Sequence, residues 1–260
     1  MDFMNLILQK ADFFLLIWGR VVGLFLAAIP FNSRNLPIQV RVWLAALVAF
    51  FLASVYSQQS PPIAGTLGGY LLQFLGEVLI GLMLGFLTQI TFAIFQYAGQ
   101  IIDMQIGYGI VNVIDPQSGV QVPVIGTFKY LLAIVLFLSI DGHHYLLAAV
   151  DKSYRVLPVG EVHLTGSSYS FLVDLMGEMF TAAFQIALPI LGALFIADLA
   201  LGVVARTVPQ INVFLIGMPL KIGLGVALML LLLPLLIWMF GRTFAGLFED
   251  LNRILLILGR

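Results

Sequence analysis

Residues 78–102, VLIGLMLGFLTQITFAIFQYAGQII, contain no charged side chain. A helix needs about 20 mainly apolar residues to cross the hydrocarbon core of a bilayer. A lipid-exposed segment of this kind must be helical, because unsatisfied peptide groups are costly in hydrocarbon. The stretch therefore predicts a long membrane helix. Three other charge-free stretches predict more of them: 42–76, 179–197 and 222–241.

The composition of the 260-residue chain is typical of a membrane protein. It is 61% hydrophobic and 10% charged, with a mean hydropathy of +1.07, whereas soluble domains are roughly half apolar and about a quarter charged. The net charge of −1 argues against nucleic acid as a partner. The absence of cysteine excludes disulfides and cysteine nucleophiles. We expect one all-α membrane domain over residues 1–260.

Turn residues divide the chain into about six long apolar helices and an amphipathic C-terminal tail, 243–260. In the tail, one face carries only apolar side chains, from Leu247 to Leu258. Loops that carry basic residues are expected on the cytoplasmic side of the membrane. Six simple spans cannot place all of these loops on that side. Either a segment turns back, for which Pro234 is a candidate, or the helices are not a simple lipid-solvated bundle. The expected helices cover 12–30, 38–57, 68–102, 122–150, 170–204 and 212–241.

Polar side chains form a narrow stripe on the third expected helix. At 100° per residue, one face collects Gln89, Gln96, Gln100 and Asp103. Amides and carboxylates do not face lipid. The stripe therefore either lines a polar conduit or contacts partner subunits, or it bonds this chain's own helices to one another.

Among the segments next to the long apolar helices, the loop 107–119 has the sequence least typical of a helix. Its β-branched residues are stiff, and Asp115-Pro116 favours a turn. Non-helical backbone at membrane depth must be buried in protein or line a cavity. A plug in a pore and an ordinary interhelical loop are both compatible with this pattern. The plug candidates are Gly107, Tyr108, Gly109, Ile110, Val111, Asn112, Val113, Ile114, Asp115, Pro116 and Gly119.

Isolated charges in or near apolar runs are the remaining candidates for chemistry: Glu77, Asp198 and Arg206. We expect Asp198 to pair with Arg206, two turns later, with proton transfer as the alternative. His143-His144 is weak evidence for a metal, since adjacent helical residues do not share a face. No nucleotide-binding or catalytic motif appears, so we expect neither an enzyme nor a cofactor.

A small-xxx-small pattern at Gly81 and Gly85 permits close approach of a second helix. The pattern is equally compatible with an oligomer contact and with packing inside the chain.

Three motifs resemble the FliR family of flagellar type III export gates, which is related to the injectisome export-apparatus T components. They are EVLIGLMLGF at 77–86, AGQIIDMQIG at 98–107, and ARTVPQINVF at 205–214, followed by GMPLKI at 217–222. The resemblance covers essentially the whole chain, and the third motif is the most specific.

The resemblance implies a structural gate subunit in the bacterial inner (cell) membrane, at the flagellar basal body. The fold would join a part like FliP to a part like FliQ, and FliP, FliQ, FlhB and FlhA would be partners. Unfolded flagellar substrates would pass through, and loop 107–119 would match the family's plug.

Two alternatives to the flagellar gate stay open. One is an injectisome export subunit. The other is a secondary transporter for a small solute, with Glu77, Asp103 or Asp198 in its site. An intramembrane enzyme that uses Asp198 or His143-His144 is a remote third.

Overall fold

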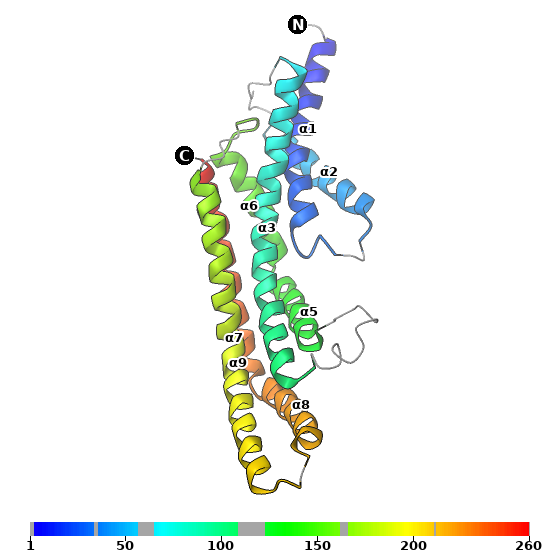
Figure 1. Cartoon of the computed structure of the whole chain (residues 1–260). Helices are drawn as coiled ribbons and strands as arrows, with labels where there is room; N and C mark the ends of the chain where they lie inside the picture. Colours follow the sequence, from blue (N-terminus) through cyan, green and yellow to red (C-terminus); the bar gives the residue numbers. More distant parts are fainter. Residues whose placement is uncertain are drawn as a thin grey trace. The chain divides into compact units, whose positions relative to one another are not determined.

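The computed structural model describes residues 3–33, 36–56, 65–108, 123–161, 166–210 and 212–259, and its regular elements are all helices (Figure 1). Among the described residues, three helices are long and apolar enough to cross a membrane, and up to five spans result if each of two bent pairs counts as one. The prediction of an all-α membrane protein is therefore confirmed. The described helices are α1 (Phe3–Ala27), α2 (Ile38–Val55), α3 (Leu67–Ile106), α5 (Val124–Ser139), α6 (Gly142–Val156), α7 (Gly166–Thr207), α8 (Val213–Leu231) and α9 (Leu233–Leu258).

Two of the segments expected as single helices are broken, the second of them beside Pro234, the candidate turn. The segment expected at 122–150 is two helices, because Asp141 adopts a left-handed φ of 56° just before α6. The helix expected to end at residue 241 ends instead at Leu231, and α9 begins after a bend of 63°. Pro234 explains this second break, since it lacks the N–H that a continuous helix would donate to Leu230. The expected C-terminal tail is thus the second half of α9.

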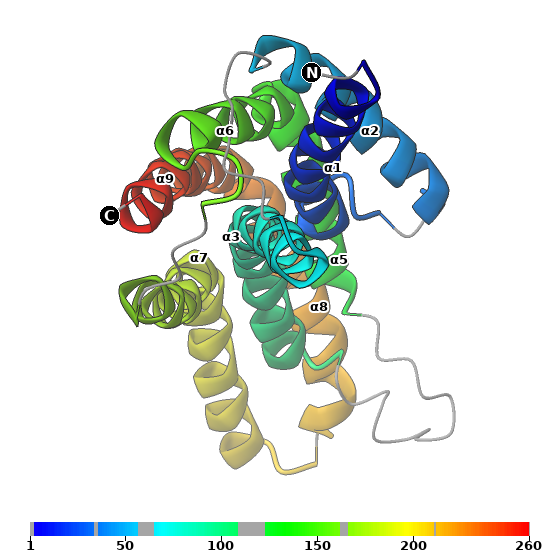
Figure 2. The ribbon, with the colours of Figure 1, turned by 90° about the horizontal axis from the view of Figure 1, so that it is seen from above.

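The chain forms two compact units. The first consists of residues 1–91, 137–175 and 244–260. In this unit α1 lies beside the first half of α3, and α6 lies beside the end of α9 (Figures 1 and 2). The predicted apolar face of the C-terminal tail is buried: Leu247, Leu251, Ile254, Leu255 and Leu258 are at most 2% exposed.

The second unit consists of residues 92–136 and 176–243. Aromatic rings form much of its core. The ring centroids of Phe95 and Phe240 are 4.0 Å apart, and those of Phe92 and Tyr130 are 6.0 Å apart. Gly99 and Gly126 let α3 and α5 approach closely, because a Cβ on Gly99 would lie 2.3 Å from the Cα of Gly126.

Candidate functional site

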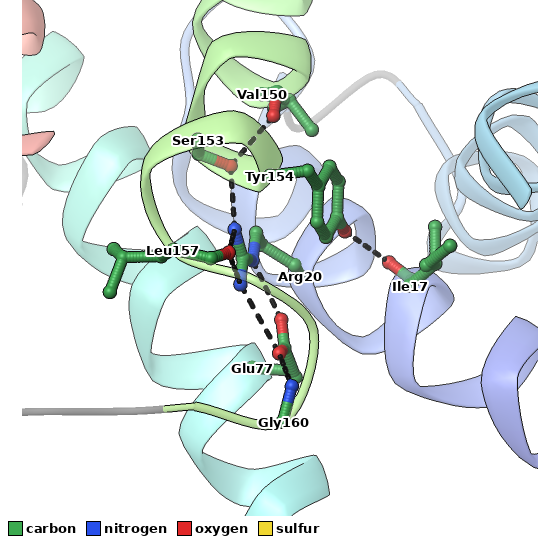
Figure 3. Close-up of polar contacts among 8 residues, drawn as sticks. All are labelled: Ile17, Arg20, Glu77, Val150, Ser153, Tyr154, Leu157 and Gly160. Atoms are coloured by element: carbon green, nitrogen blue, oxygen red, sulfur yellow. Dashed lines mark hydrogen bonds and ion pairs between the residues drawn. The ribbon is translucent and has the colours of Figure 1, made fainter. Parts of the chain in front are cut away.

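A fully buried ion pair lies in the first unit. The side chains of Arg20 on α1 and Glu77 on α3 have no exposed surface. Their contact is bidentate: Nε donates to Oε2 at 2.6 Å, and Nη2 donates to Oε1 at 3.2 Å (Figure 3). Two parallel N–H bonds to one carboxylate are the strongest geometry available to arginine.

The rest of the guanidinium bonds to α6 and the residue after it. Nη1 donates to the Ser153 hydroxyl at 2.8 Å, and both terminal nitrogens donate to the carbonyl of Leu157 at 3.2 Å. The Tyr154 ring lies 4.1 Å from the guanidinium carbon, and its hydroxyl donates to the Ile17 carbonyl. Arginine has five N–H groups, and the five bonds give each of them an acceptor (Figure 3).

The Glu77 carboxylate also receives a bond from the backbone. Oε1 accepts the N–H of Gly160 at 2.8 Å. Gly160 has a positive φ of 85°, which glycine adopts without strain. We call Arg20, Glu77, Ser153, Tyr154, Leu157 and Gly160 the Arg20 network. It links α1, α3, α6 and the turn after α6.

Glycines explain how α1 and α3 come close enough for this pair. A Cβ on Gly81 would lie 1.9 Å from the carbonyl oxygen of Arg20, and one on Gly85 would lie 2.5 Å from the Cβ of Ala27. The small-xxx-small pattern of α3 therefore packs inside the chain, against α1. Of the two interpretations of this pattern, the structure supports internal packing.

Glu77 was among the isolated charges singled out from the sequence, whereas Arg20 was not. The missed signal was available, since Arg20 is the one charged residue between Phe13 and Ala28. A charge in an otherwise apolar helix needs a partner, and Glu77 is the one acid in residues 67–102. Ser153 and Tyr154 gave no comparable signal, because their role depends on the position of α6.

A second polar contact in the same unit lies at the end of α2. The Tyr56 hydroxyl donates to the carboxylate of Asp151 at 2.8 Å. Burial raises the pKa of Tyr56; Arg155 lowers it in part, and the bond to Asp151 raises it. The hydroxyl therefore stays protonated as a donor, and it links α2 to α6.

Some residues of the polar stripe on α3 are hydrogen-bonded within the chain, and others are partly or fully exposed. In the first unit, the Gln89 amide donates to the Ala27 carbonyl at 2.8 Å. In the second unit, Asp103 is buried and accepts the N–H groups of Ile125 and Gly126, each at 3.0 Å. Gln96 is exposed, and Gln100 is half-buried. Two members thus bond to the chain itself, and Gln96 and Gln100 are the members available to a partner.

Asp198 has a different partner from the one expected. Its carboxylate contacts Lys221 Nζ at 2.9 Å and accepts a bond from the Gln105 amide at 2.9 Å. The predicted pairing with Arg206 is wrong, and Arg206 is exposed. The turn after α7 reverses the chain so that α8 presents Lys221 to Asp198, which spacing along one helix could not indicate. An internal ion pair is nevertheless present.

We expect charge reversal to identify this partner. Asp198→Lys alone places two ammonium groups together and should lower the yield of folded protein. Adding Lys221→Asp should restore the yield, whereas adding Arg206→Asp should not. The yield is measured by size-exclusion chromatography of the purified chain. Recovery with the Arg206 change, and none with the Lys221 change, would contradict the observed pairing.

Most of the predicted plug loop lies outside the described residues. Only Gly107 and Tyr108 are described, and residues 109–119 are not. Gly107 has a φ of 101°, which suits a glycine that ends a helix.

Asp141, His143 and His144 form a group with metal-binding side chains at the start of α6. Their ligand atoms lie within 4.8 Å of one another, and Asp141 and His144 are exposed. The left-handed Asp141 brings the group together at the helix end, although the two histidines are adjacent. Within the group, His144 Nδ1 lies 3.4 Å from the Asp141 carboxylate.

Long apolar helices packed around the buried Arg20–Glu77 ion pair define a helical membrane protein. The family model described as "Bacterial export proteins, family 1" matches residues 11–247, and the chain belongs to this family. It is 35% identical to the flagellar biosynthetic protein FliR of Bacillus subtilis (strain 168), over 98% of this chain and 99% of that protein. It is 31% identical to the protein of the same name from Escherichia coli (strain K12), over 91% and 90%. The predicted FliR family membership is confirmed, and with it a role in flagellar biogenesis and protein export.

Proposed function

We propose that this chain is a structural subunit of the pore, or gate, through which the flagellar type III apparatus exports unfolded substrates. It would act in the bacterial inner membrane, within the flagellar basal body. FliP and FliQ would be its direct partners in the gate, and FlhA and FlhB would be further components. Flagellar export is favoured over an injectisome role because the relatives reported above are flagellar proteins.

The observation that carries this proposal is the apolar surface of α7. In the second unit, large exposed apolar side chains run from Met176 to Val204, which at about 1.5 Å per residue is about 40 Å along the helix. A bilayer's hydrocarbon core is only about 30 Å thick. Lipid therefore cannot cover the whole apolar surface of a helix that crosses the membrane, and the part outside the hydrocarbon core would be covered by protein. Neighbouring subunits of a hetero-oligomeric gate would bury this apolar surface of α7.

The charges in the apolar helices also favour a structural subunit over a solute transporter. Glu77 is fully bonded within the Arg20 network. Asp103 accepts two backbone N–H groups, and Asp198 contacts Lys221. The transporter alternative places its substrate or ion site at one of these carboxylates. Each of the three instead holds parts of the chain together.

The proposed mechanism is passive. The loop 107–119 and its apolar neighbours would close the pore, because ions lose their hydration in a tight apolar constriction. An unfolded substrate would displace the loop. The flagellar ATPase and the proton gradient would supply the energy.

Deletion of residues 107–119 tests this function. In cells that co-express FliP and FliQ, we expect the deletion to leak ions at rest while the wild-type chain stays tight. A second variant replaces the loop with glycine and serine at equal length, which separates loss of the apolar side chains from loss of chain length. Both must first be shown to assemble. An assembled deletion that stays tight would contradict the plug, and a wild-type chain that never joins FliP and FliQ would contradict the gate.

A further inference from the structure

Three side chains of metal-binding types meet where α6 begins, and the turn before the helix fixes where they lie. Asp141 has a left-handed φ of 56°, which aspartate adopts more readily than most residues. Gly142 follows at a position that suits only glycine, since a Cβ there would lie 2.3 Å from the ring of Phe137. That ring is fully buried and has little room to move aside. The turn thus holds Asp141 beside the first turn of α6, which carries His143 and His144.

The two histidines are adjacent in sequence, and neighbours on a helix normally point to different sides. Here the ring centroids of His143 and His144 are only 4.1 Å apart, and the ring planes are tilted by 37°. One nitrogen of each ring and one carboxylate oxygen of Asp141 all lie within 4.8 Å of one another. The start of α6 therefore brings two imidazoles and a carboxylate together.

The spacing of His144 and Asp141 is that of two ligands of one ion. His144 Nδ1 lies 3.4 Å from the Asp141 carboxylate, which is longer than the roughly 2.7–3.2 Å of a usual N–H···O hydrogen bond. Ligand atoms at about 2.0–2.2 Å from a tetrahedral zinc ion are roughly 3.3–3.6 Å apart. A nitrogen of His143 is already within 4.8 Å, so small side-chain rotations would complete a set of three ligands.

Two of the three groups are not used for the bonds that they would usually make. An aspartate just before a helix usually accepts an N–H of the first turn, but the Asp141 carboxylate makes no such bond to α6. His143 Nδ1 is buried and has no hydrogen-bond partner in the part of the chain that the structure describes. A buried nitrogen without a partner is costly, and an ion bound through it would supply the partner.

The other two groups are open to water. The side chains of Asp141 and His144 are 70% and 67% exposed, so a dissolved ion can reach them and they are free to rotate toward it. The N-terminus of a helix carries a partial positive charge, which opposes a cation. The negative charge of Asp141 offsets this effect, and binding should therefore depend strongly on that carboxylate.

We propose that Asp141, His143 and His144 bind a divalent transition-metal ion of the zinc class. Two imidazoles and a carboxylate, with water in the remaining position, are a known ligand set for zinc. Mg²⁺ and Ca²⁺ prefer oxygen ligands alone. All three residues lie in the first unit, and the ion joins the turn to the first turn of α6. Binding requires neither a pore nor a partner, so it is independent of the proposed function.

Isothermal titration calorimetry with Zn²⁺ tests the site on the full chain in detergent micelles, in an excess of Mg²⁺. The affinity tag must contain no histidine. His144→Ala removes an exposed ligand, and Asp141→Asn removes the charge while keeping a residue that tolerates the left-handed backbone. His163→Ala is the matched control, because His163 is the third histidine of the chain and lies outside the described residues.

We expect the wild-type chain and His163→Ala to bind one Zn²⁺ per chain with equal affinity. His144→Ala and Asp141→Asn should each weaken binding by more than about tenfold, since loss of even an outer-shell partner costs roughly 10–100-fold. Zn²⁺ should raise the thermal unfolding midpoint of the wild type and the control, but not of these two variants, because a ligand stabilises the fold that binds it.

Three results would overturn the proposal. The first is a wild-type chain that does not bind Zn²⁺ one to one. The second is wild-type affinity in either His144→Ala or Asp141→Asn. The third is loss of binding in His163→Ala, which would place the ion elsewhere. Both test positions are exposed, so the variants should unfold at the wild-type midpoint without Zn²⁺, and a change in affinity then reports on the ligands alone.

Discussion

Replacing Glu77 with alanine is expected to destabilise the chain by about 3–5 kcal/mol, the usual cost of removing one partner from a buried ion pair. The Arg20 guanidinium would lose the acceptor of two of its five bonds and stay buried. Arg20→Ala should be as damaging, because it leaves the carboxylate without its ion partner. The measurement is the thermal unfolding midpoint and the yield of the purified chain.

A double replacement distinguishes the charge from the packing. Arg20→Met with Glu77→Leu removes both charges at similar volume, and such exchanges are often neutral or stabilising. We expect the double variant to recover most of the stability that each single variant loses. Arg155→Ala is the matched control, since the Arg155 side chain is 69% exposed where it contacts Asp151, and it should change stability far less. A stable Glu77→Ala chain would show that the pair is not buried as described.

Replacing Gly81 with alanine is the second change that we expect to lower the stability of the chain strongly. The new Cβ would lie 1.9 Å from the Arg20 carbonyl oxygen and 2.8 Å from the Leu24 nitrogen. Both are backbone atoms, so no side chain can rotate away, and α1 itself must move. We expect the chain to lose more stability than the range of about 1–3 kcal/mol that is usual for overpacking. The reason is that the movement of α1 also separates Arg20 from Glu77.

Gly68, on the same helix, is the matched control for Gly81. A Cβ at Gly68 would meet nothing within 4 Å. Gly68→Ala should therefore stabilise the helix slightly, by up to about 0.5–1 kcal/mol. The unfolding midpoints of the two variants are compared with that of the wild type. Equal tolerance of both changes would rule out the close contact of α1 with α3.

The polar contacts were predictable in part, and the failures have specific causes. The sequence identified Glu77, Asp103 and Asp198 as charges that need partners, because an unpaired charge is costly in an apolar setting. It identified none of their partners. Asp198 was assigned to Arg206 by helical spacing, but the turn into α8 brings Lys221 to it instead. Asp103 bonds to backbone N–H groups, which no sequence pattern marks.

The sequence by itself determined the helical membrane fold, the buried face of the C-terminal tail and the family. These follow from local quantities: runs of apolar residues, their period along the helix and short motifs. Only the tertiary structure decided that Gly81 packs against α1 and that Arg20 and Glu77 form a pair 57 positions apart. It also decided that Asp103 holds the start of α5, whereas Pro234 had already marked the region where α8 bends into α9 as a candidate turn. The reason is physical, since each of these contacts depends on which helix faces lie together, and many pairings of apolar helices bury similar surface.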